Sequence, residues 1–303
     1  MSLFAALTRP IADRFRVAVS GSPDGAPDWA RRMLEGDDEG LFGEESAVWD
    51  VHGSLSTLVG GVRALLLQAA HPAALAGVAD HSRYQSDPIG RLVGTTRWLV
   101  VTTFGATSVV AQEAARVNAM HARVSGTFDD QAGASRPYAA RDPRFLLWVH
   151  CAFTDSFLKA HQALGFPIRH GADRYVAEWS RSAEPLGLTS APMSVRALED
   201  TLQDFREHDL VASDTTRTVV GFILNPPFGR AATMFYRVLA NAAIATLDPQ
   251  DLQLLGLQPR SRRWLSAARM GLRVLGAILG PESPSQKFAR QRIARLRSTS
   301  DQT

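Results

Sequence analysis

The sequence is poor in cysteine, in lysine and in long apolar runs. Its single cysteine, Cys151, excludes an intramolecular disulfide. The run that comes nearest to a membrane span, residues 98–112, is too short and contains threonine and glycine, so we expect no transmembrane helix. Arginines and an aspartate interrupt residues 1–17, which excludes a secretory signal peptide. Together these absences predict a cytoplasmic protein.

The charge balance is nearly neutral, and its basic part is almost entirely arginine. Lysine and arginine together number 33 against 30 acidic residues, and only Lys159 and Lys287 are lysines. Zinc-finger spacing, RNP signatures and lysine-rich tails are missing from the sequence, so we expect no nucleic-acid partner. With 303 residues, 45% of them hydrophobic, the chain can bury one large core or two modest ones. We predict an N-terminal arm and loop over residues 1–44 and one helical domain over 45–303.

Signals for helix starts and stops run through most of the chain. Asp87-Pro88 and Asp142-Pro143 each combine an N-cap with a proline in the first turn, and Gly105 and Gly165 end the helices that follow. The predicted helices cover residues 45–70, 72–80, 88–104, 108–125, 143–164, 171–185, 194–207, 229–245, 261–278 and 284–298. Hairpin dipeptides and βαβ alternation are missing from the sequence, and residues 127–141 are interpreted as a loop. The expected fold class is therefore all-α, a single multi-helix bundle.

One face of the predicted helix 88–104 carries polar residues. This stripe repeats every three or four residues and consists of Arg91, Thr95, Trp98 and Thr102. Gly94 lies on the same side, where a mid-helix glycine costs about 1 kcal/mol relative to alanine. Such a glycine indicates close approach of something bulky, either another helix or a flat cofactor. A notch for helix packing is the simpler interpretation.

The predicted helix 108–125 directs a histidine at the core. Its apolar stripe consists of Val110, Ala114, Val117, His121 and Val124. The side chains expected to face elsewhere are Gln112, Glu113, Arg116 and Arg123. A core histidine is more often a hydrogen-bonded structural residue than a ligand, and the partner of His121 would then be Asn118 or a backbone carbonyl.

The predicted helix 143–164 adds a second polar pair on an inward face. Its inward stripe consists of Leu147, His150, Thr154, Phe157 and His161, whereas Arg144, Asp155, Lys159 and Gln162 lie largely on another face. His150 and Thr154 lie one turn apart, so both side chains can contact the same bound group. A polar pair whose hydrogen bonds are satisfied within a helix bundle is the simpler interpretation. Two more histidines, His71 and His81, flank the predicted helix 72–80.

Several histidine chemistries are excluded by missing motifs. Neither His-Glu-x-x-His nor Glu-x-x-His occurs, which argues against a zinc hydrolase and a carboxylate-bridged di-iron bundle. One cysteine cannot supply the Cys-x-x-Cys-His motif of covalently attached haem, and Cys151 is best explained as a small buried hydrophobe. A single axial imidazole on noncovalent haem remains, and composition alone supports it only weakly.

A composite of short motifs carries a family resemblance. The stretch from about residue 60 to 165 resembles the catalytic domain shared by the rubber oxygenases, also called latex clearing proteins, and a fungal endoplasmic-reticulum oxygenase. The matching text is Gln68-Ala-Ala-His71-Pro72, Gly77-Val-Ala-Asp-His81-Ser82, Asp87-Pro88-x-Gly90-Arg91-Leu-x-x-Thr95, Met120-His121-Ala-x-Val124, Asp142-Pro143, Trp148-Val-His150 and Asp155-Ser156.

The resemblance implies helices packed in globin-like style around a haem b pocket. On that match His121 is the axial iron ligand, and the pocket is lined by Arg91, Gly94, Thr95, Trp98 and Thr154. An arginine beside haem can pair with a propionate. Rubber oxygenases carry an iron-ligating lysine at the position of Gly94. Its loss implies an open distal side, or His71 or His150 as the distal group.

Two functions from different classes follow from this resemblance. The first is a haem-dependent oxygenase that binds O₂ opposite His121 and attacks a small apolar, olefinic or isoprenoid substrate, with an electron donor if the reaction needs one. Polyisoprene is extracellular, so rubber itself is not the expected substrate. The second is a non-enzymatic sensor or carrier of haem or another apolar ligand.

The arginine-rich C-terminus allows peripheral membrane contact. Predicted helices 261–278 and 284–298 form a basic amphipathic pair that could dock on an anionic membrane. Packing of these helices on their own domain, with a solvated basic face, is the interpretation we favour.

Overall fold

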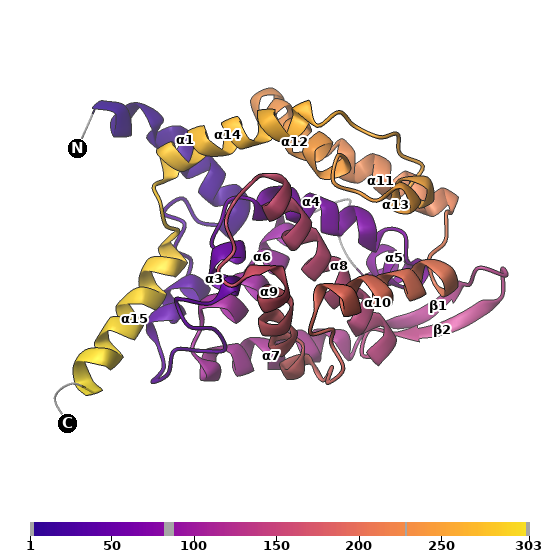
Figure 1. Cartoon of the computed structure of the whole chain (residues 1–303), viewed down its shortest axis with the longest axis horizontal. Helices are drawn as coiled ribbons and strands as arrows, with labels where there is room; N and C mark the ends of the chain where they lie inside the picture. The colour runs from indigo at the N-terminus through magenta and orange to yellow at the C-terminus, as the bar shows by residue number, and fades with distance from the viewer. Residues whose placement is uncertain (1–2, 82–87, 228, 301–303) are drawn as a thin grey trace.

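The computed structural model describes residues 3–81, 88–227 and 229–300, and helices dominate them (Figure 1). The helices of the first half are α1 (Leu3–Ser20), α2 (Asp28–Arg31), α3 (Ala47–His52), α4 (Thr57–Gln68), α5 (Pro72–His81), α6 (Pro88–Phe104) and α7 (Thr107–His121). Those that follow are α8 (Pro143–Ala163), α9 (Gly171–Trp179), α10 (Val195–His208), α11 (Asp214–Leu224), α12 (Arg230–Ile244), α13 (Pro249–Leu254), α14 (Arg263–Leu279) and α15 (Pro284–Ser300). Short 3₁₀ turns are η1 (Arg32–Leu34), η2 (Ser180–Ser182) and η3 (Glu184–Leu186). No helix among the described residues is both long and apolar enough to cross a membrane.

Local signals place the start of α8 and the span of α6 where the sequence predicts them. The Asp142 carboxylate accepts a hydrogen bond from the backbone N–H of Arg144 at 2.8 Å, and Pro143 opens α8. Helix α6 spans the predicted 88–104, although its predicted N-cap, Asp87, lies outside the described residues. The predicted helix 45–70 is two helices, because Gly53 ends α3 and a turn precedes α4.

Two antiparallel strands, β1 (Ser125–Asp129) and β2 (Ser135–Ala139), correct the expectation of a loop over 127–141. Helix α7 ends at His121, earlier than predicted. The tight turn depends on Asp130, whose carboxylate accepts from the backbone N–H groups of Ala132 and Ala134, and on Gly133 at φ +76°. Tyr138 is buried against Gly126 of the partner strand. The described residues thus form a mostly α fold with one hairpin. A search for hairpin dipeptides in the sequence misses this hairpin.

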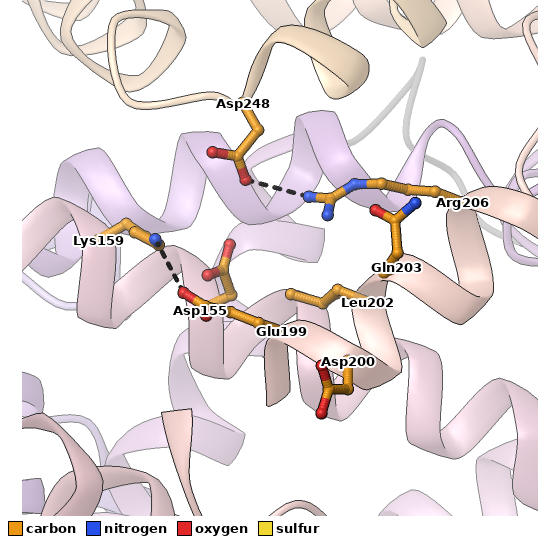
Figure 2. Close-up of a pocket in the computed structure, with 8 residues that line it drawn as sticks. All are labelled: Asp155, Lys159, Glu199, Asp200, Leu202, Gln203, Arg206 and Asp248. Carbon is orange, nitrogen blue, oxygen red and sulfur yellow. Dashed lines mark hydrogen bonds and ion pairs between the residues drawn. The ribbon is translucent and has the colours of Figure 1, made fainter. Parts of the chain in front are cut away.

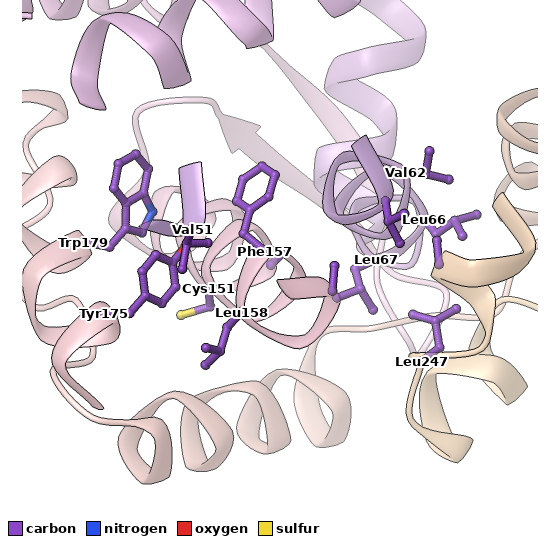
Figure 3. Packing of buried hydrophobic residues seen from close by; sticks show 14 of the residues in the cluster. Val51, Val62, Leu66, Leu67, Cys151, Phe157, Leu158, Tyr175, Trp179 and Leu247 are labelled. Atoms are coloured by element: carbon purple, nitrogen blue, oxygen red, sulfur yellow. The ribbon is translucent and has the colours of Figure 1, made fainter. Parts of the chain in front are cut away.

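The pair of helices α4 and α8 forms the centre of the molecule. A Cβ atom on Gly60 of α4 would lie 2.6 Å from the Phe157 ring and 3.1 Å from its Cα, so only glycine permits this approach. Figure 3 shows the side chains of α4, α8 and α9 meeting in this core, among them Leu67, Phe157 and Trp179. The predicted N-terminal arm contributes Met33 and Phe42 to the same core cluster, and α1 contacts α6 and α14. The division at residue 44 stays a prediction.

A buried ion pair fastens α4 to α8. The Arg63 guanidinium donates to the Asp155 carboxylate at 2.5 Å and to the Ser156 hydroxyl at 3.1 Å, and Arg63 and Asp155 are almost fully buried. In the last turn of α8, His161 hydrogen-bonds the Ser56 hydroxyl. The prediction that Asp155 faces away from the core is therefore wrong, because α8 is buried on nearly every side.

We expect Arg63→Met to lower the free energy of unfolding by about 3–5 kcal/mol, since it leaves the Asp155 carboxylate buried without its partner. Urea unfolding followed by circular dichroism measures this change. Arg174→Met, which removes the exposed partner of Glu178, is the matched control and should cost about 1 kcal/mol or less. Equal losses in the two variants would contradict a central role for the buried pair.

Candidate functional site

The predicted site residues come from α6, α7, α8 and the α4–α5 junction. His71 occupies that junction and is almost fully buried, with its ring centroid 5.3 Å from that of Phe145 and 5.7 Å from that of Trp148. Both aromatic residues belong to the first half of α8, from which His150 also projects. These contacts place His71 against the part of α8 that carries the predicted pair His150 and Thr154.

Buried polar atoms without a hydrogen-bond partner among the described residues occur on the elements that carry the predicted site residues. They are Gln68 Nε2, both ring nitrogens of His71, Thr102 Oγ1, Thr103 Oγ1, His121 Nδ1, Trp148 Nε1 and His150 Nε2. Among the described residues only Arg63 and Arg290 contribute other atoms of this kind. Each buried group left unpaired would cost roughly 1–3 kcal/mol, so these atoms call for a partner outside the described residues.

His121 lies at the last position of α7 and is half-buried. Burial, assisted by the charge of Arg141, lowers its pKa, so the imidazole is neutral at neutral pH. Its expected structural partner is occupied elsewhere, because the Asn118 side chain donates to the Pro185 carbonyl at 3.1 Å. His121 Nδ1 has no partner within the described part of the chain. A structural histidine held by Asn118 is therefore not what the structure contains.

His71 and His150 are also held in their neutral forms. Burial lowers the pKa of each imidazole to about 4. For His71 the charges of Asp209 and Arg144 act in opposite directions and matter less than burial. Both rings are uncharged at neutral pH, and each presents at least one nitrogen that no described residue binds.

The remaining predicted residues differ in what they offer. The Thr154 hydroxyl is fully buried and donates to the His150 carbonyl at 2.7 Å, so its proton is used within α8. Thr95 and Trp98 are half-buried on α6. A Cβ atom on Gly94 would meet no described atom within 4 Å, which argues against a helix-packing notch. The side chains of Arg91 and His81 lie outside the described part of the structure.

A comparison with protein families identifies the domain. The family model described as "ER-bound oxygenase mpaB/B'/Rubber oxygenase, catalytic domain" matches residues 49–279. The chain belongs to this family. The match covers most of the chain and extends well beyond the 60–165 stretch that carries the sequence motifs. Membership makes the protein an oxygenase-type oxidoreductase. No curated protein and no solved structure matches the chain.

Glu113 is a positioning residue of this oxygenase domain that sequence periodicity misses. It was predicted to face away from the core, yet its carboxylate is buried and accepts from both Arg97 of α6 and Arg116 of α7 at 2.6–3.0 Å. Burial alone would raise the pKa of Glu113, but the hydrogen bonds from the two arginines lower it. The ionised carboxylate fixes α6 relative to α7, and so fixes Gly94 and Thr95 relative to His121. Its only sequence signal is the Glu113–Arg116 spacing.

A hollow of about 340 Å³ lies beside α8 and α10 (Figure 2). It is lined by Asp155, Lys159, Glu199, Asp200, Leu202, Gln203, Arg206 and Asp248. Most of its charges pair with one another or with their surroundings, as Lys159 does with Glu199 and Arg206 with Asp248. No three His, Cys, Asp or Glu side chains within the described ranges form a metal-binding group. The residues that line this hollow therefore do not resemble His71, His121 and His150, whose ring nitrogens include atoms without a partner among the described residues.

We expect His71→Gln to weaken the acid sensitivity of the fold. The folded pKa of about 4 lies below the unfolded value of 6.5, so the unfolded state takes up the proton first and stability is lost as pH falls from 6.5 towards 4. One pKa unit corresponds to about 1.4 kcal/mol, so removing this group should spare roughly 2–3 kcal/mol between pH 7 and pH 4.5. Urea unfolding at the two pH values measures the difference.

The matched control is His208→Gln. His208 is exposed, and hydrogen bonding to the Asp204 carbonyl raises its pKa, so its contribution to stability has the opposite sign. Its loss cannot reduce acid sensitivity. If His71→Gln and wild type lose the same stability on acidification, the neutral buried state of His71 is refuted.

Proposed function

We propose that this chain is a haem b-dependent oxygenase that acts on a small apolar, olefinic or isoprenoid substrate. The observation that carries the proposal is the set of buried polar atoms, those of His71, His121 and His150 among them, that have no hydrogen-bond partner among the described residues and lie within the span that matches the oxygenase family. The residues present fit such a cofactor, because His121 offers a neutral imidazole and Gly94 adjoins space that described atoms do not fill.

Each predicted residue has a separate task in this proposal. His121 would hold the iron, Arg91 would pair with a propionate, and Gly94, Thr95 and Trp98 would form one wall of the pocket. When bound, haem would supply a redox-active iron that activates O₂. The lack of a side chain at Gly94 leaves no lysine to close the distal side.

The surroundings of His71 suit an apolar substrate. Its ring is enclosed by the aromatic rings of Phe145, Trp148 and Phe205, which exclude water. His71 and His150 are uncharged at neutral pH, so either can donate or accept a hydrogen bond without placing a charge beside the substrate. Thr154 would act through its acceptor oxygen, since its proton is bound to the His150 carbonyl.

The electron balance separates two reactions of this class. Cleavage of one C=C bond by one O₂ into two carbonyl groups balances without an external reductant. Hydroxylation of the same substrate consumes two electrons from a donor and releases water. We favour cleavage for an olefinic substrate, and the dependence of O₂ consumption on an added reductant distinguishes the two.

The purified protein should carry iron in equimolar amount and show a Soret band, and His121→Ala should lose both. The exposed His170, which is not among the predicted site residues, provides the control His170→Ala, which should keep both. Circular dichroism verifies that both variants fold. A colourless protein that does not take up haemin would overturn the proposal. Haem binding without O₂ consumption in the presence of alkenes would instead favour the sensor or carrier function.

Gly94→Lys should fold normally, because its Cβ meets no described atom within 4 Å. If Gly94 occupies the position of the ligating lysine in rubber oxygenases, the new amine reaches the iron and converts the ferric spectrum to that of a six-coordinate, low-spin haem. Gly94→Gln, which offers no strong ligand, should leave the spectrum unchanged. Identical spectra for the two variants would show that Gly94 does not face the iron.

A further inference from the structure

Exposed apolar side chains gather on one edge of the molecule. Of the seven large hydrophobic residues that are exposed within the described ranges, five lie on α1, α12 and α14, namely Ile11, Val17, Met234, Met270 and Val274. Helix α14 contacts both α1 and α12. Figure 1 shows the three helices along the upper edge of the view. We call this surface, with its flanking arginines, the α1–α12–α14 face.

The charge of the α1–α12–α14 face is one-sided. The three helices contain eight arginines and a single acidic residue, Asp13, which pairs with Arg9 and Arg16. Within the described part of the chain no ion pair involves Arg14, Arg237, Arg263 or Arg273. The whole chain is almost neutral, at +3, so this edge concentrates positive charge that acidic residues balance elsewhere.

Helix α14 shows most clearly how apolar side chains and arginines alternate on this face. Its outward stripe consists of Arg263, Ser266, Ala267, Met270, Arg273, Val274 and Ala277, with Met270 59% and Val274 53% exposed. The amphipathic helix α10 is different, since its exposed residues are Arg196, Glu199, Asp200, Glu207 and His208. An ordinary solvated face carries both signs of charge, as α10 does. Apolar side chains interleaved with arginine are typical of helices that lie in a lipid interface.

Helix α15 does not take part, although it is the most basic helix of the chain. Arg292 is fully buried and donates to the carbonyls of Met33, Asp38, Glu39 and Phe104. Arg290 and Arg297 pair with Glu44. The two C-terminal helices therefore differ in their surroundings. Helix α15 packs on its own domain, as predicted from the sequence, whereas α14 presents an arginine-rich outer surface.

We propose that the α1–α12–α14 face docks on the surface of an anionic lipid bilayer. The arginines would meet lipid phosphates, and Met234, Met270 and Val274 would enter the interface. A second copy of the chain is disfavoured because two such faces would bring arginine against arginine. Nucleic acid matches the charge but gives the exposed methionines and valines no partner. This docking does not depend on the proposed oxygenase chemistry.

A fluorophore at Met270 tests the docking directly. Cys151 is fully buried, so Met270→Cys carries one accessible thiol for a polarity-sensitive dye, and Met193→Cys is a matched control at 66% exposure outside the face. With vesicles of phosphatidylcholine plus phosphatidylglycerol, the dye at 270 should shift to the blue and the dye at 193 should not. With phosphatidylcholine alone neither should shift.

Charge removal provides the second arm of the test. Arg263→Gln with Arg273→Gln should weaken binding in vesicle sedimentation roughly thirtyfold, because each arginine contributes about 1 kcal/mol at an anionic surface. Arg123→Gln with Arg196→Gln removes two exposed arginines elsewhere and should change it less than twofold. Equal responses at positions 193 and 270, or equal binding by the two charge variants, overturns the proposal. So does a shift at 270 that appears with duplex DNA but not with vesicles, or with rising protein concentration alone.

Discussion

The buried ion pair between Arg63 and Asp155 is the interaction on which the rest of the structure depends. It joins the two central helices, and it sets the rotation of α8 about its own axis. Asp155 adjoins Thr154 and lies just over one turn from His150. Pinning its carboxylate to α4 therefore decides where the histidine and threonine point. The close approach at Gly60 and the Ser56–His161 hydrogen bond secure the same register at two further positions.

A second ionic device fixes the other half of the candidate site. The Glu113 carboxylate accepts hydrogen bonds from Arg97 of α6 and Arg116 of α7 and so joins the two helices. Gly94, Thr95 and His121 are therefore positioned by charge as well as by packing. On the helices of this frame several buried polar atoms have no partner among the described residues, and the free-energy cost of leaving such atoms unpaired requires a stable frame. The proposed haem pocket would thus lower the stability of the fold, and the ion pairs of the buried Asp155 and Glu113 carboxylates offset that loss.

Local signals were enough to predict most of the helices, but not which of their charged side chains are buried. The Asp142-Pro143 start of α8 and the limits of α6 are determined by a few adjacent residues. Val110, Ala114 and Val117 of the predicted α7 stripe are buried, whereas His121 is half-buried and Val124 lies beyond the end of the helix. Asp155 and Glu113 were assigned to outward faces because periodicity counts a carboxylate as polar and cannot see an arginine on a neighbouring helix. The hairpin was missed because its turn uses Asp130 and Gly133 rather than a two-residue motif. Of the site, the inward direction of His71 and His150 was predictable, and the lack of a hydrogen-bond partner for the His71 ring among the described residues was not.

The central claim is that the unpaired groups around His71, His121 and His150 form a site for haem. Thermal unfolding of the haem-free chain with increasing haemin tests it most directly, because a ligand that binds only the folded state raises the midpoint with its concentration. The account predicts a rise of several degrees for wild type and for His170→Ala, and little or no rise for His121→Ala. A midpoint that haemin does not move in the wild-type chain, or moves equally in His121→Ala, would contradict it.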